Sequence, residues 1–208
     1  MRWLDGKQGL FDTLRTRLSE GLFSNTVSDF IDAKLAERDT RHTKQGGQRY
    51  VVEPNVKEGK GGLRDLQSLF WIAKYMHGVT DARQLVDLGM FSDEEFETFV
   101  QAEDFQWAVR CHLHLITNRA MDQLTFDLQV EVAERMGYTD RAGRRAVEHF
   151  MQDYFRHATS VGDLTRIFLT GLEAIHAKSE PMLARFFKRK KKVAAGYAIL
   201  HNRITIAD

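Results

Sequence analysis

The chain has 208 residues, of which 43% are hydrophobic and 28% are charged, a balance typical of a folded globular domain. Its 30 basic and 29 acidic residues give a net charge of +1, which provides no overall positive field for binding nucleic acid. A single cysteine, Cys111, excludes an internal disulfide framework, and its apolar neighbours predict a small core residue. No apolar run reaches the roughly 20 residues of a membrane span, so we expect a cytoplasmic protein with no membrane partner.

Hydrophobic spacing predicts an all-α fold. Only two prolines, Pro54 and Pro181, interrupt the chain, which leaves long segments free to be helical. Helical periodicity predicts two early helices, one over residues 10–18 and one starting near residue 30, followed by a polar break over 38–48. The later helices are expected over residues 66–77, 81–88, 92–118, 126–136 and 142–172, with Ser92 and Glu95 at the spacing of a capping box.

These elements predict a helical bundle with a four-helix up-and-down core, extra short helices and a small C-terminal β-hairpin. We expect N-terminal helices over residues 1–48, the bundle over 49–177, and a basic linker with the hairpin over 178–208. The hairpin turn is predicted at His201-Asn202. The lysine run at 188–192 is interpreted as a solvated linker, with binding of nucleic acid or acidic lipid as the alternative.

The segment from Glu53 to Gln67 combines three glycines with three cations directly before a predicted helix. Glycines let backbone N–H groups approach a ligand, and a helix start adds free N–H groups and a positive dipole end. The candidate phosphate-binding residues are Lys57, Gly59, Lys60, Gly61, Gly62 and Arg64, supported by Glu53, Asn55, Glu58, Asp65 and Gln67. Among the latter, Glu58 and Asp65 are expected to orient the cations. No Gly-Lys-Ser/Thr closes the segment as in a P-loop, so a glycine-rich turn that only caps a helix remains the alternative.

The same segment resembles a known family. It reads Glu-Pro-Asn-Val-Lys-Glu-Gly-Lys-Gly-Gly-Leu-Arg-Asp-Leu-Gln and is similar to a motif of the bacterial PII uridylyltransferase/uridylyl-removing enzymes. Two further blocks, Phe105 to Gln129 and His149 to Ala158, resemble the next family blocks in the same order. The resemblance covers roughly residues 25–175. This chain has Lys60 where the family motif has proline.

The resemblance implies that the chain is the helical region of a longer enzyme. In that family a nucleotidyltransferase domain precedes this region, and an HD hydrolase domain and two ACT domains follow it. The chain contains no Gly-Ser, Asp-x-Asp or His-Asp pair, so we expect it to be inactive alone and to hold no cofactor. Mg²⁺ is expected in the missing transferase domain, which would transfer a uridylyl group from UTP to the PII signal protein. Lys57 and Arg64 would neutralise phosphate charge.

Two alternatives remain from the sequence. One is the helical domain of a glutamine synthetase adenylyltransferase, which has a similar glycine-rich motif and uses ATP. The other is a bundle without a catalytic role that docks neighbouring domains.

Other polar and aromatic residues have structural interpretations. His112 and His114 lie two residues apart, about 200° around a helix, so they are not expected to share a metal ion. Arg119, Asp122, Asp127 and Gln129 are expected to form a polar cluster that pairs internally or lines a groove. Phe70, Trp71 and Tyr75 predict core packing, with base stacking as the alternative.

Overall fold

The structure is a computed structural model that describes residues 3–177, 191–194, 197–200 and 203–206, with side chains up to residue 172. The chain divides into two compact units, Met1–Phe168 and Leu169–Asp208, here called unit 1 and unit 2. The expected domain boundary between residues 48 and 49 stays a prediction.

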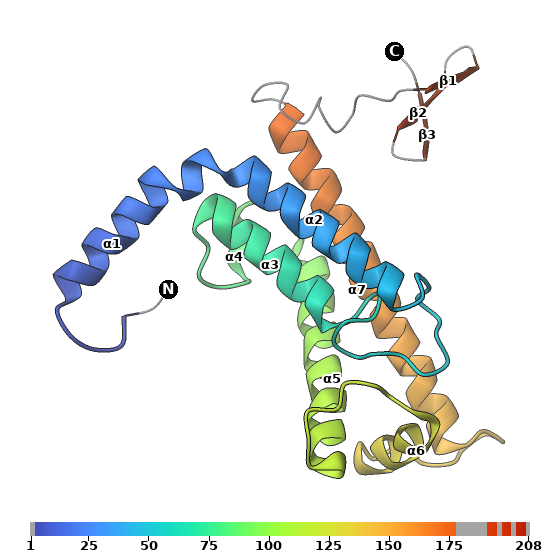
Figure 1. Ribbon diagram of the computed structural model, residues 1–208. Helices are drawn as coiled ribbons and strands as arrows, with labels where there is room; N and C mark the ends of the chain where they lie inside the picture. Colours follow the sequence, from blue (N-terminus) through green and yellow to red (C-terminus); the bar gives the residue numbers. More distant parts are fainter. Residues whose placement is uncertain (1–2, 178–190, 195–196, 201–202, 207–208) are drawn as a thin grey trace. The chain divides into compact units, whose positions relative to one another are not determined.

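Unit 1 is entirely helical apart from its loops, which confirms the predicted all-α bundle (Figure 1). Helices α1 to α3 cover Gln8–Gly21, Val27–Lys44 and Leu63–His77, and a short 3-10 helix, η1 (Phe23–Asn25), joins the first two. Helices α4 to α7 cover Gln84–Asp87, Asp93–Thr117, Phe126–Arg135 and Ala146–Ala177, and the last of these continues into unit 2.

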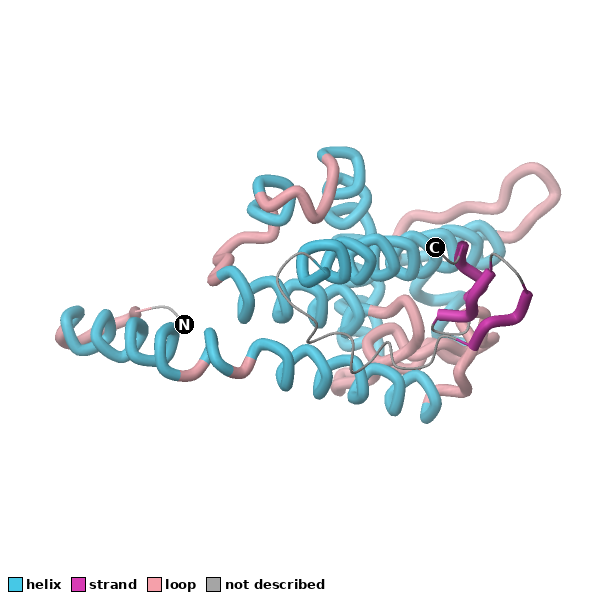
Figure 2. The backbone as a smooth tube through the Cα atoms, turned by 90° about the horizontal axis from the view of Figure 1, so that it is seen from above, coloured by secondary structure: helices cyan, strands magenta, loops and turns pink. Residues whose placement is uncertain are grey.

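Unit 2 contains the end of α7 and a three-stranded antiparallel sheet in the order β1-β2-β3. The strands are β1 (Lys191–Ala194), β2 (Tyr197–Leu200) and β3 (Arg203–Ile206), drawn in magenta in Figure 2. β2 and β3 pair from Tyr197 with Ile206 to Leu200 with Arg203, as the expected hairpin requires. The predicted turn at His201-Asn202 and most of the predicted linker, residues 178–190, lie outside the described residues.

Local signals in the sequence set the ends of several helices. Ser92 accepts a hydrogen bond from the Glu95 N–H at 3.2 Å, and Glu95 accepts one from the Ser92 N–H at 2.7 Å, which confirms the capping box of α5. Gly78 ends α3 in the left-handed region at φ +69°, and its N–H donates to the Lys74 carbonyl. From its cap, α5 runs as one unbroken helix to Thr117.

The predicted polar break over residues 38–48 is wrong, because α2 continues to Lys44. Two polar residues of its last turns, Arg41 and His42, are held by tertiary contacts with Asp65. Arg41 is only 8% exposed and forms an ion pair with Asp65 at the start of α3. Helical periodicity alone missed this part of α2 because its stabilising partner lies 24 residues further along the chain.

The core of unit 1 brings the segment before α3 together with three helices. Its fully buried members are Val56 from that segment, Val109 and Leu113 from α5, Leu124 from the following loop, Val132 and Ala133 from α6, and Phe150 from α7, with Tyr154 of α7 nearly so. Fully burying one large apolar side chain contributes about 1.5–3 kcal/mol, so these contacts hold the segment firmly against the bundle.

Helix α1 and residue Cys111 of α5 are exposed although the sequence suggested apolar packing. None of the residues of α1 is buried, although its leucines follow helical spacing. The prediction that Cys111 lies in the core is wrong, because its side chain is exposed on α5. The buried positions of α5 include Val109 and Leu113, and Cys111 lies between them at a spacing of two, which turns it to the opposite side of the helix.

The aromatic residues of α3 pack against neighbouring side chains but stay partly exposed. Tyr75 stacks on Phe30 with ring centroids 4.0 Å apart, and its hydroxyl lies 2.6 Å from Thr26 Oγ1. Phe70, Trp71 and Tyr75 are all only half-buried, so none of them is a buried core residue as predicted. Among the described helices, none combines the length and apolar character needed to cross a membrane.

Candidate functional site

The predicted phosphate-binding segment, residues 53–67, consists of a loop over 53–62 and the start of α3, and the loop is folded by its own hydrogen bonds. The Asn55 side-chain oxygen accepts from the N–H groups of Lys57 at 3.2 Å and Glu58 at 2.7 Å, an arrangement typical of asparagine at turns. Gly59 N–H donates to the Asn55 carbonyl, and Gly62 N–H donates to the Gly59 carbonyl. These N–H groups are therefore already bonded within the protein, which leaves side chains as the main groups for binding an anion.

The glycines allow close packing of the backbone. A methyl group added at Gly61, where φ is +81°, would collide with the Ala158 carbonyl oxygen of α7 and lie 2.9 Å from its carbon. One added at Gly62 would lie 2.7 Å from the Val56 carbonyl oxygen, and one at Gly59 would collide with the Asn55 carbonyl oxygen. Only glycine therefore fits these positions without a shift of the backbone.

Gly61 is also bonded on both sides. Its N–H donates to Asp65 Oδ2 at 2.8 Å, and its carbonyl accepts from Gln106 Nε2 at 2.6 Å. Gln106 belongs to α5 and is fully buried. The loop is thereby fixed to the first turn of α3, to α5 and, through close packing at Ala158, to α7.

Two of the three predicted cations meet at one carboxylate. Glu58 Oε1 accepts a hydrogen bond from Arg64 Nη2 at 3.1 Å and lies 3.6 Å from Lys57 Nζ. Arg64 Nη1 also donates to Gln67 Oε1 at 3.2 Å. The third predicted cation, Lys60, is exposed on the loop. Glu58 therefore orients Arg64 as expected, and Gln67 provides a second acceptor for it.

The Arg64 guanidinium also lies over the Trp71 ring, 5.4 Å from its centroid, and Lys34 of α2 lies 5.2 Å from the same centroid. Both cations remain partly exposed, with 22% of each side chain accessible. The site thus presents two cations beside an aromatic surface, and an anion can approach from solvent.

Asp65 has different partners from those predicted. It pairs with Arg41 and accepts from His42 Nε2 at 3.0 Å, and both of these residues belong to α2. Burial disfavours the charged form of Asp65, but the hydrogen bonds from His42 and Gly61 and the charge of Arg41 outweigh it and hold its pKa below the usual value. Asp65 therefore joins α2 to the loop and does not orient Arg64.

Asp122 forms a second ionic cluster next to the loop. It accepts from Arg110 Nε at 2.7 Å and from His114 Nε2 at 3.2 Å, and Lys57 Nζ lies 4.0 Å from its other oxygen. Burial raises the pKa of Asp122, but the hydrogen bonds from Arg110 and His114 and the nearby positive charges outweigh burial and lower it overall. Asp122 therefore pairs with residues of α5 that the sequence did not indicate, and not with the predicted Arg119. Gln129 of the same predicted cluster donates to the carbonyls of Val52 and Leu124.

The remaining supporting residues connect the loop to the segment before α6. Asn55 and Gln123 form an isolated antiparallel bridge, and Val56 N–H donates to the Asp122 carbonyl at 2.8 Å. The Glu53 carboxylate accepts from the N–H of Phe126 at 2.9 Å, at the first turn of α6. Glu53 therefore satisfies a free donor of that helix, where the dipole also favours negative charge.

A metal site is not built by these groups. Across the part of the chain that the structure describes, no three or more His, Cys, Asp or Glu residues come together in a way that could hold a metal ion.

Comparison with known proteins identifies the family. The family model described as GlnD PII-uridylyltransferase matches residues 29–169, which include the loop, α3, α5, α6 and most of α7. The chain belongs to the PII-uridylyltransferase family. It is 61% identical over 207 residues to a bifunctional uridylyltransferase/uridylyl-removing enzyme of Ruegeria pomeroyi and 59% identical to one of Cereibacter sphaeroides. No solved structure matches it.

The two relatives are much longer than this chain. Each match covers the whole chain but only 23% of the Ruegeria pomeroyi protein and 22% of the Cereibacter sphaeroides protein. The chain thus spans less than a quarter of the length of the curated uridylyltransferases that it matches.

Proposed function

We propose that this chain is the helical region of a longer uridylyltransferase that transfers a uridylyl group from UTP to the PII signal protein. The chain's family and its full coverage by two enzymes named uridylyltransferase support this assignment. In the proposed enzyme a neighbouring nucleotidyltransferase domain performs the chemistry, and an HD domain adjoins the other side. Mg²⁺ would be held by the nucleotidyltransferase domain, which would use it to offset charge on the nucleotide. The chain alone is then inactive.

The contribution of this region is charge stabilisation by Lys57 and Arg64. The observation that carries the proposal is the arrangement at Glu58 of two partly exposed cations, Lys57 from the loop and Arg64 from the first turn of α3. The loop is hydrogen-bonded to α3 and α5. Arginine binds phosphate oxygens through a forked pair of donors, and lysine acts as a mobile point charge. Pre-placed charges that meet a triphosphate or pyrophosphate lower the barrier to nucleotidyl transfer without reorganisation during the reaction.

The test replaces the matching segment of the Ruegeria pomeroyi enzyme with this chain and measures uridylylation of PII at varied UTP. Loss of a charge-assisted hydrogen bond costs about 1.5–3 kcal/mol, so Arg64→Ala should lower kcat/KM for UTP roughly 10- to 100-fold. Lys57→Ala should lower it less, because a single point charge is lost.

Arg83→Ala is the matched control for Arg64→Ala. Arg83 also lies over an aromatic ring, 5.1 Å from the Phe96 centroid, and also pairs with a carboxylate, that of Asp93. It is distant in sequence from the loop and is expected to leave kcat/KM unchanged. Equal, small effects of both substitutions would contradict a nucleotide contact by Arg64.

The second candidate function is a docking bundle without a part in nucleotide binding. The internal bonding of the loop N–H groups and the packing role of its glycines favour this candidate, because both features are explained by structure alone. The same kinetics separate the two functions, since a docking bundle predicts unchanged KM for UTP in the Lys57 and Arg64 variants. Replacing UTP by ATP in the assay tests the adenylyltransferase alternative.

A further inference from the structure

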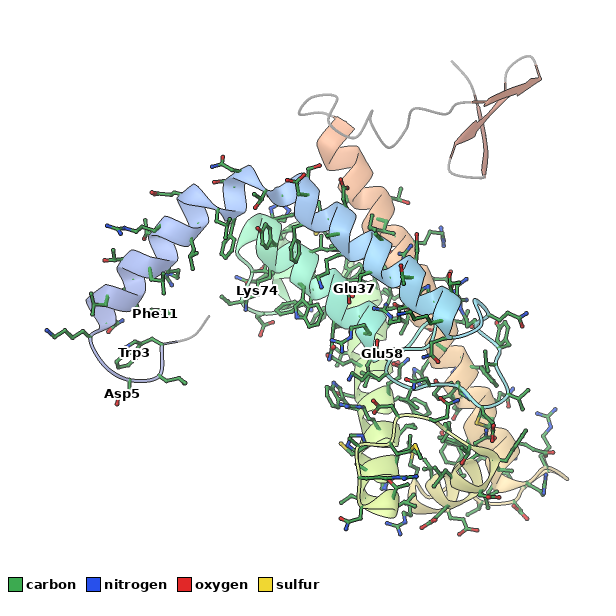
Figure 3. All side chains as sticks on the ribbon, in the orientation of Figure 1. Trp3, Asp5, Phe11, Glu37, Glu58 and Lys74 are labelled. Atoms are coloured by element: carbon green, nitrogen blue, oxygen red, sulfur yellow. The ribbon has the colours of Figure 1, made fainter. Side chains whose placement is uncertain are left out.

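Arg41 is a buried cation that lies among three carboxylates. Its side chain is 9% exposed, and one guanidinium nitrogen, Nη2, pairs with Asp65. Its Nε lies 3.7 Å from Glu58 Oε2, and its Nη1 lies 3.9 Å from Glu37 Oε1. Figure 3 labels Glu37 of α2 and Glu58 of the loop, which both face Arg41. Neither Nε nor Nη1 has a hydrogen-bond partner, so these two donors contribute mainly through charge.

Glu58 connects this buried cation to the surface cations. One of its oxygens, Oε2, faces Arg41, whereas the other, Oε1, accepts from Arg64 and lies near Lys57. Arg41 itself is fixed by Asp65, which also accepts from His42 and from the Gly61 N–H. A continuous chain of charged contacts therefore runs from the end of α2 to the proposed nucleotide-binding side chains.

We propose that Arg41 is a positioning residue that compensates the charge of Glu58 when Arg64 and Lys57 turn to the nucleotide. This inference rests on the proposed function. A phosphate group must draw Arg64 away from Glu58, whose side chain is already 28% exposed with Arg64 in place. The carboxylate is then left beside the incoming anion without this surface cation. With Arg41 in place, the carboxylate keeps a cation at its other oxygen. Without the Arg41 contact, an uncompensated negative charge repels the phosphate and holds Arg64 more tightly.

The decisive variant is Arg41→Lys, because lysine keeps the charge that Asp65 requires but has no second arm to reach Glu58. In the Ruegeria pomeroyi enzyme carrying this chain, we expect Arg41→Lys to raise KM for UTP about three- to tenfold with little change in kcat. Thermal unfolding of the same protein checks that the fold is retained.

A second substitution, at Glu58, distinguishes a positioning role of Arg41 from a purely structural one. If Arg41 acts by compensating Glu58, then adding Glu58→Gln to Arg41→Lys should return KM to within about twofold of the unsubstituted enzyme. Glu37→Gln is the matched control, because Glu37 also faces Arg41 but makes its other ion pair with Lys34 and none with Arg64. Adding Glu37→Gln should leave the raised KM unchanged.

Each outcome supports or overturns the inference. A raised KM that Glu58→Gln fails to restore, in a protein that melts normally, overturns it, and so does an unchanged KM in Arg41→Lys. If Arg41→Lys does not fold, the double variant Arg41→Met/Asp65→Asn decides, because it removes both charges of the buried pair and with them the cation beside Glu58. The inference requires its KM for UTP to rise, and an unchanged KM overturns it. An unchanged KM in Arg64→Ala refutes the proposed function itself, whereas a raised KM there with no effect of Arg41→Lys refutes only this inference.

Discussion

Substitution of Gly61 by alanine tests how the loop is held against the bundle. A non-glycine residue in the left-handed region costs about 1–2 kcal/mol, and forcing a methyl group into a packed site costs about 1–3 kcal/mol more. At Gly61 both costs apply, because φ is +81° and the obstructing atoms are backbone atoms of Ala158 that cannot rotate away. We therefore expect Gly61→Ala to lower the free energy of unfolding by about 2–5 kcal/mol, a large part of the 5–15 kcal/mol typical of a folded domain.

Thermal unfolding followed by circular dichroism measures this loss. At about 2–4 °C per kcal/mol for a chain of this size, the unfolding midpoint should fall by about 4–20 °C. Gly137→Ala is the matched control, because its φ is +80° but an added methyl group there meets nothing within 4 Å. Its unfolding midpoint should fall by only about 2–8 °C, the part that comes from the left-handed backbone conformation. Equal losses in the two variants would refute the argument that close packing against α7 demands glycine at position 61.

Three further predictions use other parts of the chain. Because the folded-state pKa of Asp65 is depressed, its ion pairs stabilise the protein above the ordinary pKa of 3.8, and this stabilisation is lost as the pH falls below that value. Asp65→Asn should therefore have a smaller free energy of unfolding than the unsubstituted chain at pH 7, and that free energy should fall less on acidification. Urea unfolding from pH 7 to pH 3 measures both differences. Cys111 should react completely with a thiol reagent in the native protein, and reaction only on unfolding would contradict its exposure. Deleting residues 1–21 should change the unfolding midpoint by less than about 2 °C, because α1 contributes no buried residue; a larger loss would show that α1 packs on the bundle.

The helices were predictable where the signal is local. Apolar periodicity together with a capping box or a terminal glycine located α3, α5 and α6, because residues close in sequence determine those features. The last turns of α2 were missed because they carry polar residues that periodicity assigns to a loop. Their stability depends on Asp65, a partner that only the folded chain brings close.

The sequence predicted which residues form the candidate site but not most of their hydrogen-bond and ion-pair partners. Sequence reasoning selected Lys57, Arg64 and Glu58, and the structure brings these three together. It gave the glycines a ligand-binding role, whereas the structure shows a packing requirement at Gly61 that depends on α7, almost 100 residues away in the chain. The ionic partners of Asp65 and Asp122 also come from other helices, so no local pattern could have identified them.

The most direct test of the central claim is a crystal structure of the full-length uridylyltransferase carrying this chain, with a non-hydrolysable UTP analogue bound. The account predicts that phosphate oxygens of the analogue lie within hydrogen-bonding or ion-pairing distance of the Arg64 guanidinium and the Lys57 ammonium group, with Glu58 still facing Arg41. An analogue bound at the catalytic domain with its phosphates beyond the reach of both cations would contradict the account and favour a docking role for this helical region.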